Sequence, residues 1–231
     1  MNEKINKKIF DETKSRLFNK LRTEIQNIDY SDHNWYETRF EEIPKHLLDE
    51  WEKIEKEYGS TINPKRLKGF LYESLFYYAC LKTQTIFLGA EMMTFGEAKT
   101  SDRPPWFECV PLYDIKPILY NQLKTQRKIH VPQIEADFIL TYVDNKGHCP
   151  PSYTDVKSKK PEEYNKYWGW YIVAAMRAGF IFEIAYPKTD FPTDLNDWEI
   201  KTPCDNCKTL SNDFKKCTNC GSVIFPFTIV G

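Results

Sequence analysis

Two short stretches decide the fold: Ile134-Glu135-Ala136-Asp137-Phe138-Ile139-Leu140 and Thr154-Asp155-Val156-Lys157. The first belongs to a predicted strand over Ile134–Val143, with its acids just before the apolar run. The second belongs to a predicted strand over Tyr153–Ser158, and turn-forming residues lie between the two at Asp144–Gly147. Side chains repeat every two residues along a strand, so Asp155 and Lys157 share one face. If the two strands pair, Asp137 and Asp155 converge.

A predicted helix upstream supplies a third candidate carboxylate. Asn63 is a good N-cap and Pro64 suits the first helical position, so the helix begins there and runs to about Leu81. The run is broadly apolar, which predicts a mostly buried helix. Within it stands Glu73, and burying a charge is costly unless the charge is paired or ligated.

The remaining elements complete an α/β pattern. Two more strands are expected at Ile86–Phe95 and Phe180–Tyr186, an ordered loop over Asp102–Pro117, and helices over Ile115–Arg127 and Pro161–Ala178. From Pro64 the main order is helix, strand, strand, strand, helix, strand, which favours a central sheet covered by helices. Apolar spacing over Ile5–Ile28 and Pro44–Tyr58 predicts an N-terminal helical region, for which we expect no chemical role.

The acids and the lysine together predict a metal site. Two carboxylates held close repel each other, and a divalent cation removes that conflict. Ligation by oxygen alone suits magnesium. Such a site allows phosphodiester hydrolysis, in which the metal activates a water molecule and Lys157 orients that water or stabilises the extra negative charge.

This series of residues resembles the PD-(D/E)XK nuclease superfamily, to which restriction endonucleases and archaeal Holliday-junction resolvases belong. The resemblance rests on Glu73 on a helix, Glu135-x-Asp137, and Asp155-x-Lys157 followed by a helix. It covers roughly Pro64–Pro187 and extends to the element order, because the family core is αβββαβ. Ala136 stands where many members have proline.

The resemblance implies a restriction-endonuclease-like αβββαβ core with a central mixed sheet. It also implies that Glu73, Asp137 and Asp155 bind Mg²⁺ or Mn²⁺ and that Lys157 is the catalytic lysine.

Other residues near the predicted site leave alternatives open. Glu97-Ala98-Lys99, with Glu91 upstream, is a competing signature, but Pro104 and Pro105 follow it instead of a helix. Glu135 either joins the site or pairs with a lysine. His130 and His148 are expected to be loop histidines.

Two CxxC knuckles, Cys204–Cys207 and Cys217–Cys220, stand nine residues apart near the C-terminus. Two thiolates from each knuckle can complete one tetrahedral zinc site, so we expect a zinc ribbon with Gly221 in the turn after the second knuckle. Val223–Val230 is expected to form its last strand. Cys80, Cys109 and Cys149 are expected to be reduced, without a metal role.

Composition limits the class of protein. The 231 residues include 6 Trp, 14 Tyr and 15 Phe, which is typical of a folded globular chain. No apolar run is long enough for a membrane span, and the charged start Met1–Lys8 is unlike a signal peptide. With reduced cysteines, this favours a cytoplasmic protein. The net charge of −1 requires any nucleic-acid surface to be local. Candidate contacts are Lys124, Arg127, Lys128, Lys159 and Lys160.

Three regions are therefore expected: an N-terminal helical region (1–60), a nuclease core (61–197) and a zinc ribbon (198–231). The expected function is that of a magnesium-dependent endonuclease acting on DNA, of the restriction, repair or junction-resolving type. By resemblance it could work as a homodimer. The alternatives are a non-catalytic zinc-ribbon protein that binds nucleic acid or serves in assembly, and a nuclease directed at RNA.

Overall fold

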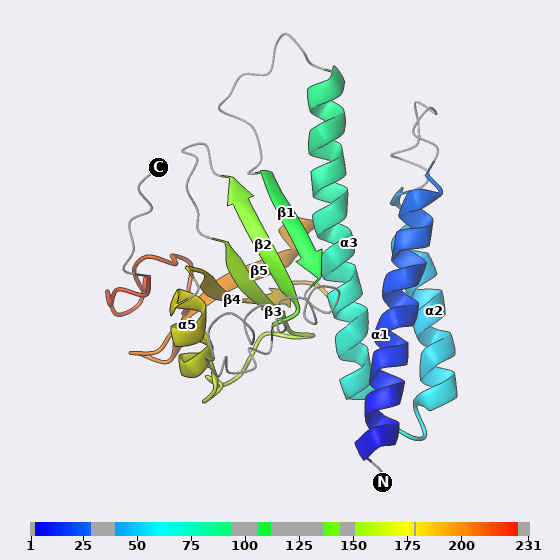
Figure 1. The fold of residues 1–231 in the computed structure, drawn as a ribbon, viewed down its shortest axis with the longest axis horizontal. Coiled ribbons are helices and arrows are strands. Elements are labelled where there is room, and N and C mark those ends of the chain that lie inside the picture. The colour runs from blue at the N-terminus through cyan, green and yellow to red at the C-terminus, as the bar shows by residue number, and fades with distance from the viewer. Residues whose placement is uncertain are drawn as a thin grey trace, which may run out of the picture.

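The computed structural model describes residues 3–28, 40–93, 106–111, 136–143, 151–177 and 179–225. It is an α/β structure in which a mixed sheet separates two groups of helices (Figure 1). The helices of one group are α1 (Glu3–Gln26), α2 (Ile43–Tyr58) and α3 (Pro64–Met93), and α5 (Trp168–Arg177) lies on the other face. The strands are β1 (Trp106–Pro111), β2 (Phe138–Val143), β3 (Ser152–Val156), β4 (Ile181–Pro187), β5 (Trp198–Cys204) and β6 (Thr209–Ser211).

The strands follow one another across the sheet in chain order, β1 to β6. Neighbours are antiparallel except for β3 and β4, which are parallel and are joined through α5. A parallel pair needs such a crossover, because a tight turn cannot return the chain to the same direction. The predicted pairing of the two signature strands is confirmed, with Phe138 opposite Thr154. The predicted turn at 144–147 lies outside the described residues.

The predicted strand over Ile86–Phe95 is wrong in its described part. Helix α3 continues through this segment to Met93. The apolar, β-branched start of the segment resembles a strand, yet no glycine or proline interrupts the chain between Leu81 and Ile86. Without a stop signal, helix propagation costs little, and local strand propensity is a weak preference that context overrides.

The first strand of the sheet lies instead within the segment predicted as a loop. Strand β1 occupies Trp106–Pro111, where aromatic and β-branched residues favour extended backbone. Prolines flank it on both sides, which limits its length. The element order helix, three strands, helix, strand therefore holds, although its first strand was placed in the wrong segment. The short helix predicted over 115–127 lies outside the described residues.

Helix α5 starts later than predicted, at Trp168 instead of Pro161. The Asn165 side-chain oxygen accepts a hydrogen bond from the Tyr167 N–H at 3.0 Å, and the Asn165 carbonyl accepts one from the Trp168 N–H. This local turn competes with helix in the preceding residues, as asparagine side chains commonly do.

One hydrophobic core joins the N-terminal helices to the sheet. Phe138 at the start of β2 is fully buried and packs among the rings of Phe18 on α1 and of Phe76 and Tyr77 on α3. On the outer side, Arg16 of α1 forms ion pairs with two α2 glutamates, Glu50 and Glu57. The helices thus cover the sheet as one packed layer.

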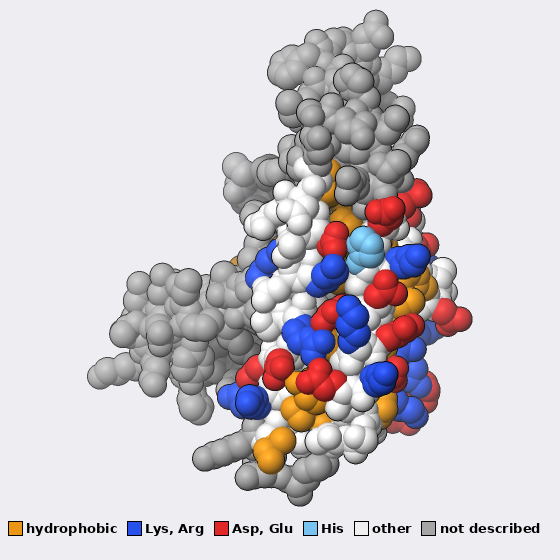
Figure 2. All heavy atoms as spheres, turned by 90° about the vertical axis from the view of Figure 1, so that its right-hand side faces the viewer, with side chains coloured by type: hydrophobic (Ala, Val, Ile, Leu, Met, Phe, Trp, Pro, Cys, Tyr) orange, Lys and Arg blue, Asp and Glu red, His pale blue; other side chains and the backbone are white. Residues whose placement is uncertain are grey.

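The outward face of the helical layer carries charges of both signs. Acidic and basic side chains alternate over it, and no large area of one sign is visible (Figure 2). Such a face is typical of a solvated helix surface. Within the described residues, no helix combines the length and apolar character needed to cross a lipid bilayer.

Because Phe138 links the sheet to two helices, its truncation should be costly. We expect Phe138→Ala to lower the free energy of unfolding by about 3 to 5 kcal/mol, as cavities left by buried aromatic residues do. Ile5→Ala on α1, where the side chain is 49% exposed, is the matched control and should change it by less than about 0.5 kcal/mol. Denaturant titration measures both, and equal effects would contradict this packing.

Candidate active site and metal site

Asp137 and Asp155 lie side by side at one end of the β2–β3 pair. Asp137 immediately precedes β2, and its neighbour Phe138 is paired with Thr154, the residue before Asp155. The Asp137 N–H donates to the Thr154 carbonyl at 2.9 Å, and Asp137 Oδ2 accepts a hydrogen bond from the Val156 N–H at 2.9 Å. Asp137 thus bonds the residues on both sides of Asp155, and the role predicted for the two aspartates stays a prediction.

Lys157 neutralises one of the two aspartates. Its Nζ lies 2.8 Å from Asp155 Oδ1 and 2.7 Å from Oδ2. Asp155 is only 5% exposed, so water solvates its charge poorly. The two residues alternate with Val156 on the strand, which is the shared-face arrangement predicted from their spacing.

Glu73 enters the site from α3 and meets a lysine that the sequence reading did not identify. Lys14 of α1 places its Nζ 2.5 Å from Glu73 Oε2 and 3.5 Å from Asp137 Oδ1. The helical region for which no chemical role was expected therefore contributes a charged group to the site. A signal was available in the sequence: Lys14 stands in the apolar stripe of α1, four residues after Phe10 and four before Phe18.

Burial and like charge dominate the electrostatics of Glu73. Burial, together with the neighbouring Asp137 carboxylate, raises the pKa of Glu73 to about 8, and Lys14 acts against this rise. Burial alone would lower the pKa of the Lys14 ammonium, but the charges of Glu73 and Asp137 outweigh burial and raise it. The site thus concentrates negative charge that two lysines partly compensate.

The three carboxylates approach from both faces of the sheet. Asp155 is paired with Ile184, which packs against α5, whereas the neighbouring pair Val156 and Ala185 packs against α1–α3. Glu73 comes from α3, and Lys14 stands between it and Asp137. In the described part of the chain, the one group of three or more residues placed to hold a metal ion is a set of cysteines, not these acids. Carboxylate oxygens are ligands that suit magnesium. In this structure the ammonium groups of Lys14 and Lys157 pair with these carboxylates.

Several other candidates cannot be placed. Glu97, Lys99, Lys124, Arg127, Lys128, His130, Glu135, His148 and Cys149 lie outside the described residues. Glu91 falls within α3 and Cys109 within β1, but their side chains are not among those described. Lys159 forms an exposed ion pair with Glu162. Cys80 is a buried free thiol in the helical core.

The four predicted zinc ligands come together at the C-terminal end of β5. The Sγ atoms of Cys204, Cys207, Cys217 and Cys220 all lie within 4.8 Å of one another. Cys204 and Cys220 Sγ atoms are 3.7 Å apart, and those of Cys207 and Cys217 are 3.6 Å apart. Four sulfurs about 2.3 Å from a tetrahedral zinc ion would be about 3.8 Å apart. The cluster could therefore hold a structural metal ion such as zinc.

The two knuckles share one backbone conformation. The Lys208 N–H donates to the Cys204 carbonyl, and the Gly221 N–H donates to the Cys217 carbonyl, so each loop closes behind its second cysteine. Both closing residues have positive φ, 59° at Lys208 and 74° at Gly221. Glycine adopts this conformation at little cost, which is the turn role predicted for Gly221. The predicted last strand lies largely beyond residue 225, and within the described part Val223 forms one isolated bridge, with Lys216.

The knuckle environment favours ionised sulfur at the exposed end of the cluster. Hydrogen bonds from Ser222 lower the pKa of the Cys220 thiol to about 5, whereas burial raises the pKa of Cys204 to about 12. A bound cation would deprotonate the buried thiol as well.

Comparison with protein-family models, with curated proteins and with solved structures gave no match for this chain. The class of site therefore has to be argued from its residues.

Purified protein should contain about one zinc ion per chain, because the cysteine cluster closes a four-thiolate site. Cys204→Ser and Cys220→Ser should lose the metal and make the residues after Trp198 sensitive to protease, since metal binding supplies most of the folding energy of such a small unit. Cys80→Ala, which lies outside the cluster, should keep it. Elemental analysis and limited proteolysis measure both properties, and zinc-free native protein would contradict the assignment.

The raised pKa of Glu73 predicts a pH-dependent stability. The folded state binds this proton more tightly than the unfolded state, so its stabilising contribution is full below about pH 4.5 and is lost as the pH rises towards about 8. Glu73→Gln lacks this ionisation. In magnesium-free buffer, the Tm of the parent should therefore fall relative to Glu73→Gln by at least about 2 °C between pH 5 and 8.

The exposed Glu52→Gln variant on α2 is the control and should follow the parent across the same range. A constant difference between parent and Glu73→Gln would show that Glu73 does not titrate in this interval.

Proposed function

We propose that this chain is a metal-dependent nuclease of the PD-(D/E)XK type that hydrolyses phosphodiester bonds, with DNA as its substrate. The observation that carries the proposal is the gathering of acids at the end of the β2–β3 pair: Asp137 bonds the backbone on both sides of Asp155, and Lys157 is bonded to Asp155. Carboxylates gathered in a poorly solvated site repel one another and are costly unless they are paired or ligated. Such an arrangement is expected where a cation is to be bound.

The order of elements around the site supports the proposal. α3, β1, β2, β3, α5 and β4 follow one another as αβββαβ, and the sheet is mixed. Asp137 directly precedes β2, Asp155 is the penultimate residue of β3, and Glu73 lies on α3.

Each residue has a role that its contacts allow. A magnesium ion bound by the carboxylates would polarise the phosphate and acidify the attacking water. Asp137 and Asp155 would hold this cation, with Glu73 completing its ligand set. Lys157 would orient the water and stabilise the negative charge that develops on the phosphate. Lys14 keeps the charge of Glu73 and Asp137 compensated within the site.

One observation favours a second candidate, a protein that binds nucleic acid without cutting it. Lys14 and Lys157 already compensate the carboxylates by direct ion pairs. A cluster neutralised in this way can be structural, holding α1, α3 and the β2–β3 pair together without a cation. The two candidate functions differ in whether the site hydrolyses phosphodiester bonds.

Cleavage assays separate the candidates. With magnesium or manganese, the parent should nick or cut duplex, branched or single-stranded DNA. Asp155→Ala and Lys157→Ala should reduce cutting by about a hundred-fold or more, as expected when stabilisation of a transition-state charge is removed. They should still bind DNA, because many phosphate contacts together set affinity.

Matched controls are available. Asp190→Ala and Lys166→Ala change exposed residues of the same charge, and Glu97→Ala and Lys99→Ala test the competing signature. All four should stay within a few-fold of the parent. The nuclease proposal fails if the parent cuts neither DNA nor RNA over a range of metals while binding one of them. Loss of activity in the Glu97 or Lys99 variants alone would move the site to that signature.

A further inference from the structure

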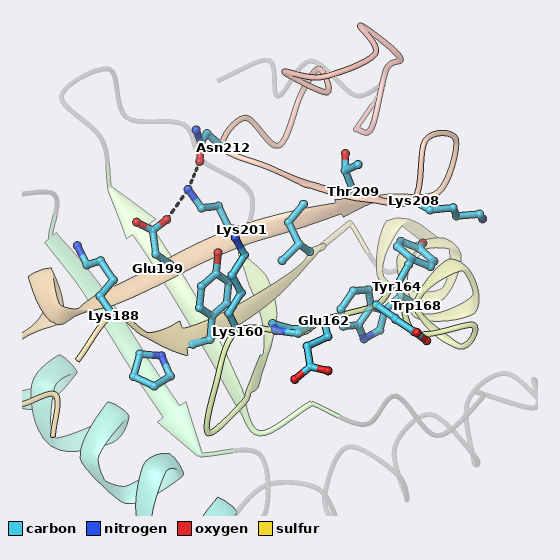
Figure 3. Close-up of a pocket in the computed structure, with 15 residues that line it drawn as sticks. Lys160, Glu162, Tyr164, Trp168, Lys188, Glu199, Lys201, Lys208, Thr209 and Asn212 are labelled. Carbon is cyan, nitrogen blue, oxygen red and sulfur yellow. Dashed lines mark hydrogen bonds and ion pairs between the residues drawn. The ribbon is translucent and has the colours of Figure 1, made fainter. Parts of the chain in front are cut away.

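A polar groove of about 810 Å³ lies between the 160–168 loop and strands β4, β5 and β6. We call it the ribbon groove, because β6 and the first knuckle form one of its walls. Figure 3 shows Lys188, Glu199 and Lys201 towards one end and Tyr164, Trp168 and Lys208 towards the other. The nuclease roles described above use none of these residues.

The ribbon groove opens on the same face of the sheet as Asp155 and Lys157. Asp155 is paired with Ile184 of β4, which is paired with Lys201 of β5, so the three lie in one row across the sheet. Neighbouring strands are about 4.8 Å apart, which puts the backbones of Asp155 and Lys201 about 10 Å apart. The groove therefore begins two strands away from the candidate catalytic aspartate.

A second row of neighbouring residues runs across the sheet from Lys157 to the ribbon groove. Its N–H donates to the Ala185 carbonyl at 2.8 Å, which sets it beside Tyr186 of β4. Tyr186 lines the groove and is paired with Glu199 of β5. Lys160, three residues after Lys157, lines the groove as well.

Positive charge is in excess at the β5 end of the groove. Glu199 forms an ion pair with Lys201, and Lys188 and Lys160 are close enough to act electrostatically on the same carboxylate. Three ammonium groups thus surround one carboxylate, and Lys201 also hydrogen-bonds Asn212 of the ribbon. Over the whole groove the lining lysines (Lys160, Lys188, Lys201 and Lys208) outnumber the lining acids (Glu162, Glu163 and Glu199) by one, and the excess at the β5 end attracts anions.

We propose that the ribbon groove binds the phosphate backbone of the nucleic-acid strand next to the bond to be cut, with the zinc ribbon as its outer wall. This inference rests on the proposed function, since it takes the strand to pass Asp155 and Lys157. The proposal gives the ribbon a role in binding as well as in stability. Asn212 of the ribbon accepts a hydrogen bond from Lys201, and Lys208 lines the end of the groove farther from Lys188. Lysine contacts with phosphate carry no sequence information, so the groove sets position and affinity and not base preference.

Charge reversal in the groove tests the proposal. The variant Lys160→Glu/Lys188→Glu changes two exposed side chains, so zinc content and Tm should match the parent. In magnesium-free buffer it should bind a fluorescent oligonucleotide at least about ten-fold more weakly. The slope of log affinity against log salt should become shallower by about 1 to 2, because each lost phosphate contact removes about 0.9. Lys160→Gln/Lys188→Gln should give an intermediate affinity.

Lys45→Glu/Lys53→Glu on α2 makes the same charge change on the outward helical face and should bind like the parent. If the groove and α2 variants bind equally well, the groove proposal is overturned, whatever the cleavage assay shows. If the groove variants lose binding but the parent cuts no substrate, the groove proposal stands and the hydrolytic one fails.

Discussion

At the end of the β2–β3 pair, Asp137 bonds the backbone on both sides of Asp155, and the site is arranged around the resulting charge. Neither aspartate is well solvated, and Glu73 adds a third buried carboxyl from α3. Lys157 compensates Asp155 from the same strand, and Lys14 reaches Glu73 and Asp137 from α1. Removing either lysine would leave buried negative charge, which costs more than the ion pair itself contributes. The helical layer is thus tied to the sheet by electrostatics as well as by the packing around Phe138.

The C-terminal cysteine cluster is continuous with this architecture through β5. That strand pairs with β4 of the main sheet over Trp198–Lys201 and with β6 over Thr202–Cys204, and it ends on the first zinc-ligand candidate. Folding of the cysteine cluster therefore fixes the end of a strand whose other end lies in the core. It also places β6 opposite the 160–168 loop, which creates the ribbon groove beside the candidate site.

Local chemistry made part of this structure predictable. The period-two spacing of Asp155 and Lys157, the cap at Asn63 and Pro64, and the two CxxC knuckles each depend on neighbours in sequence, and each was placed correctly. The order of elements was also predictable, because strands and helices alternate. By contrast, the extent of α3 and the position of β1 depend on tertiary packing that overrides local propensity. The place of Lys14 in the apolar stripe of α1 marks it as unusual, but it does not identify its partners, because Glu73 and Asp137 are 59 and 123 residues away.

The acids at the end of the β2–β3 pair are proposed to form a cation site and not only an ion-pair cluster. Crystals soaked in manganese test it directly, since anomalous scattering locates the metal. The account predicts a manganese peak about 2.1 Å from oxygens of Asp137 and Asp155, with the Lys14 ammonium displaced from Asp137. A filled cysteine site with no manganese at the aspartates, and Lys14 still between Glu73 and Asp137, would contradict it.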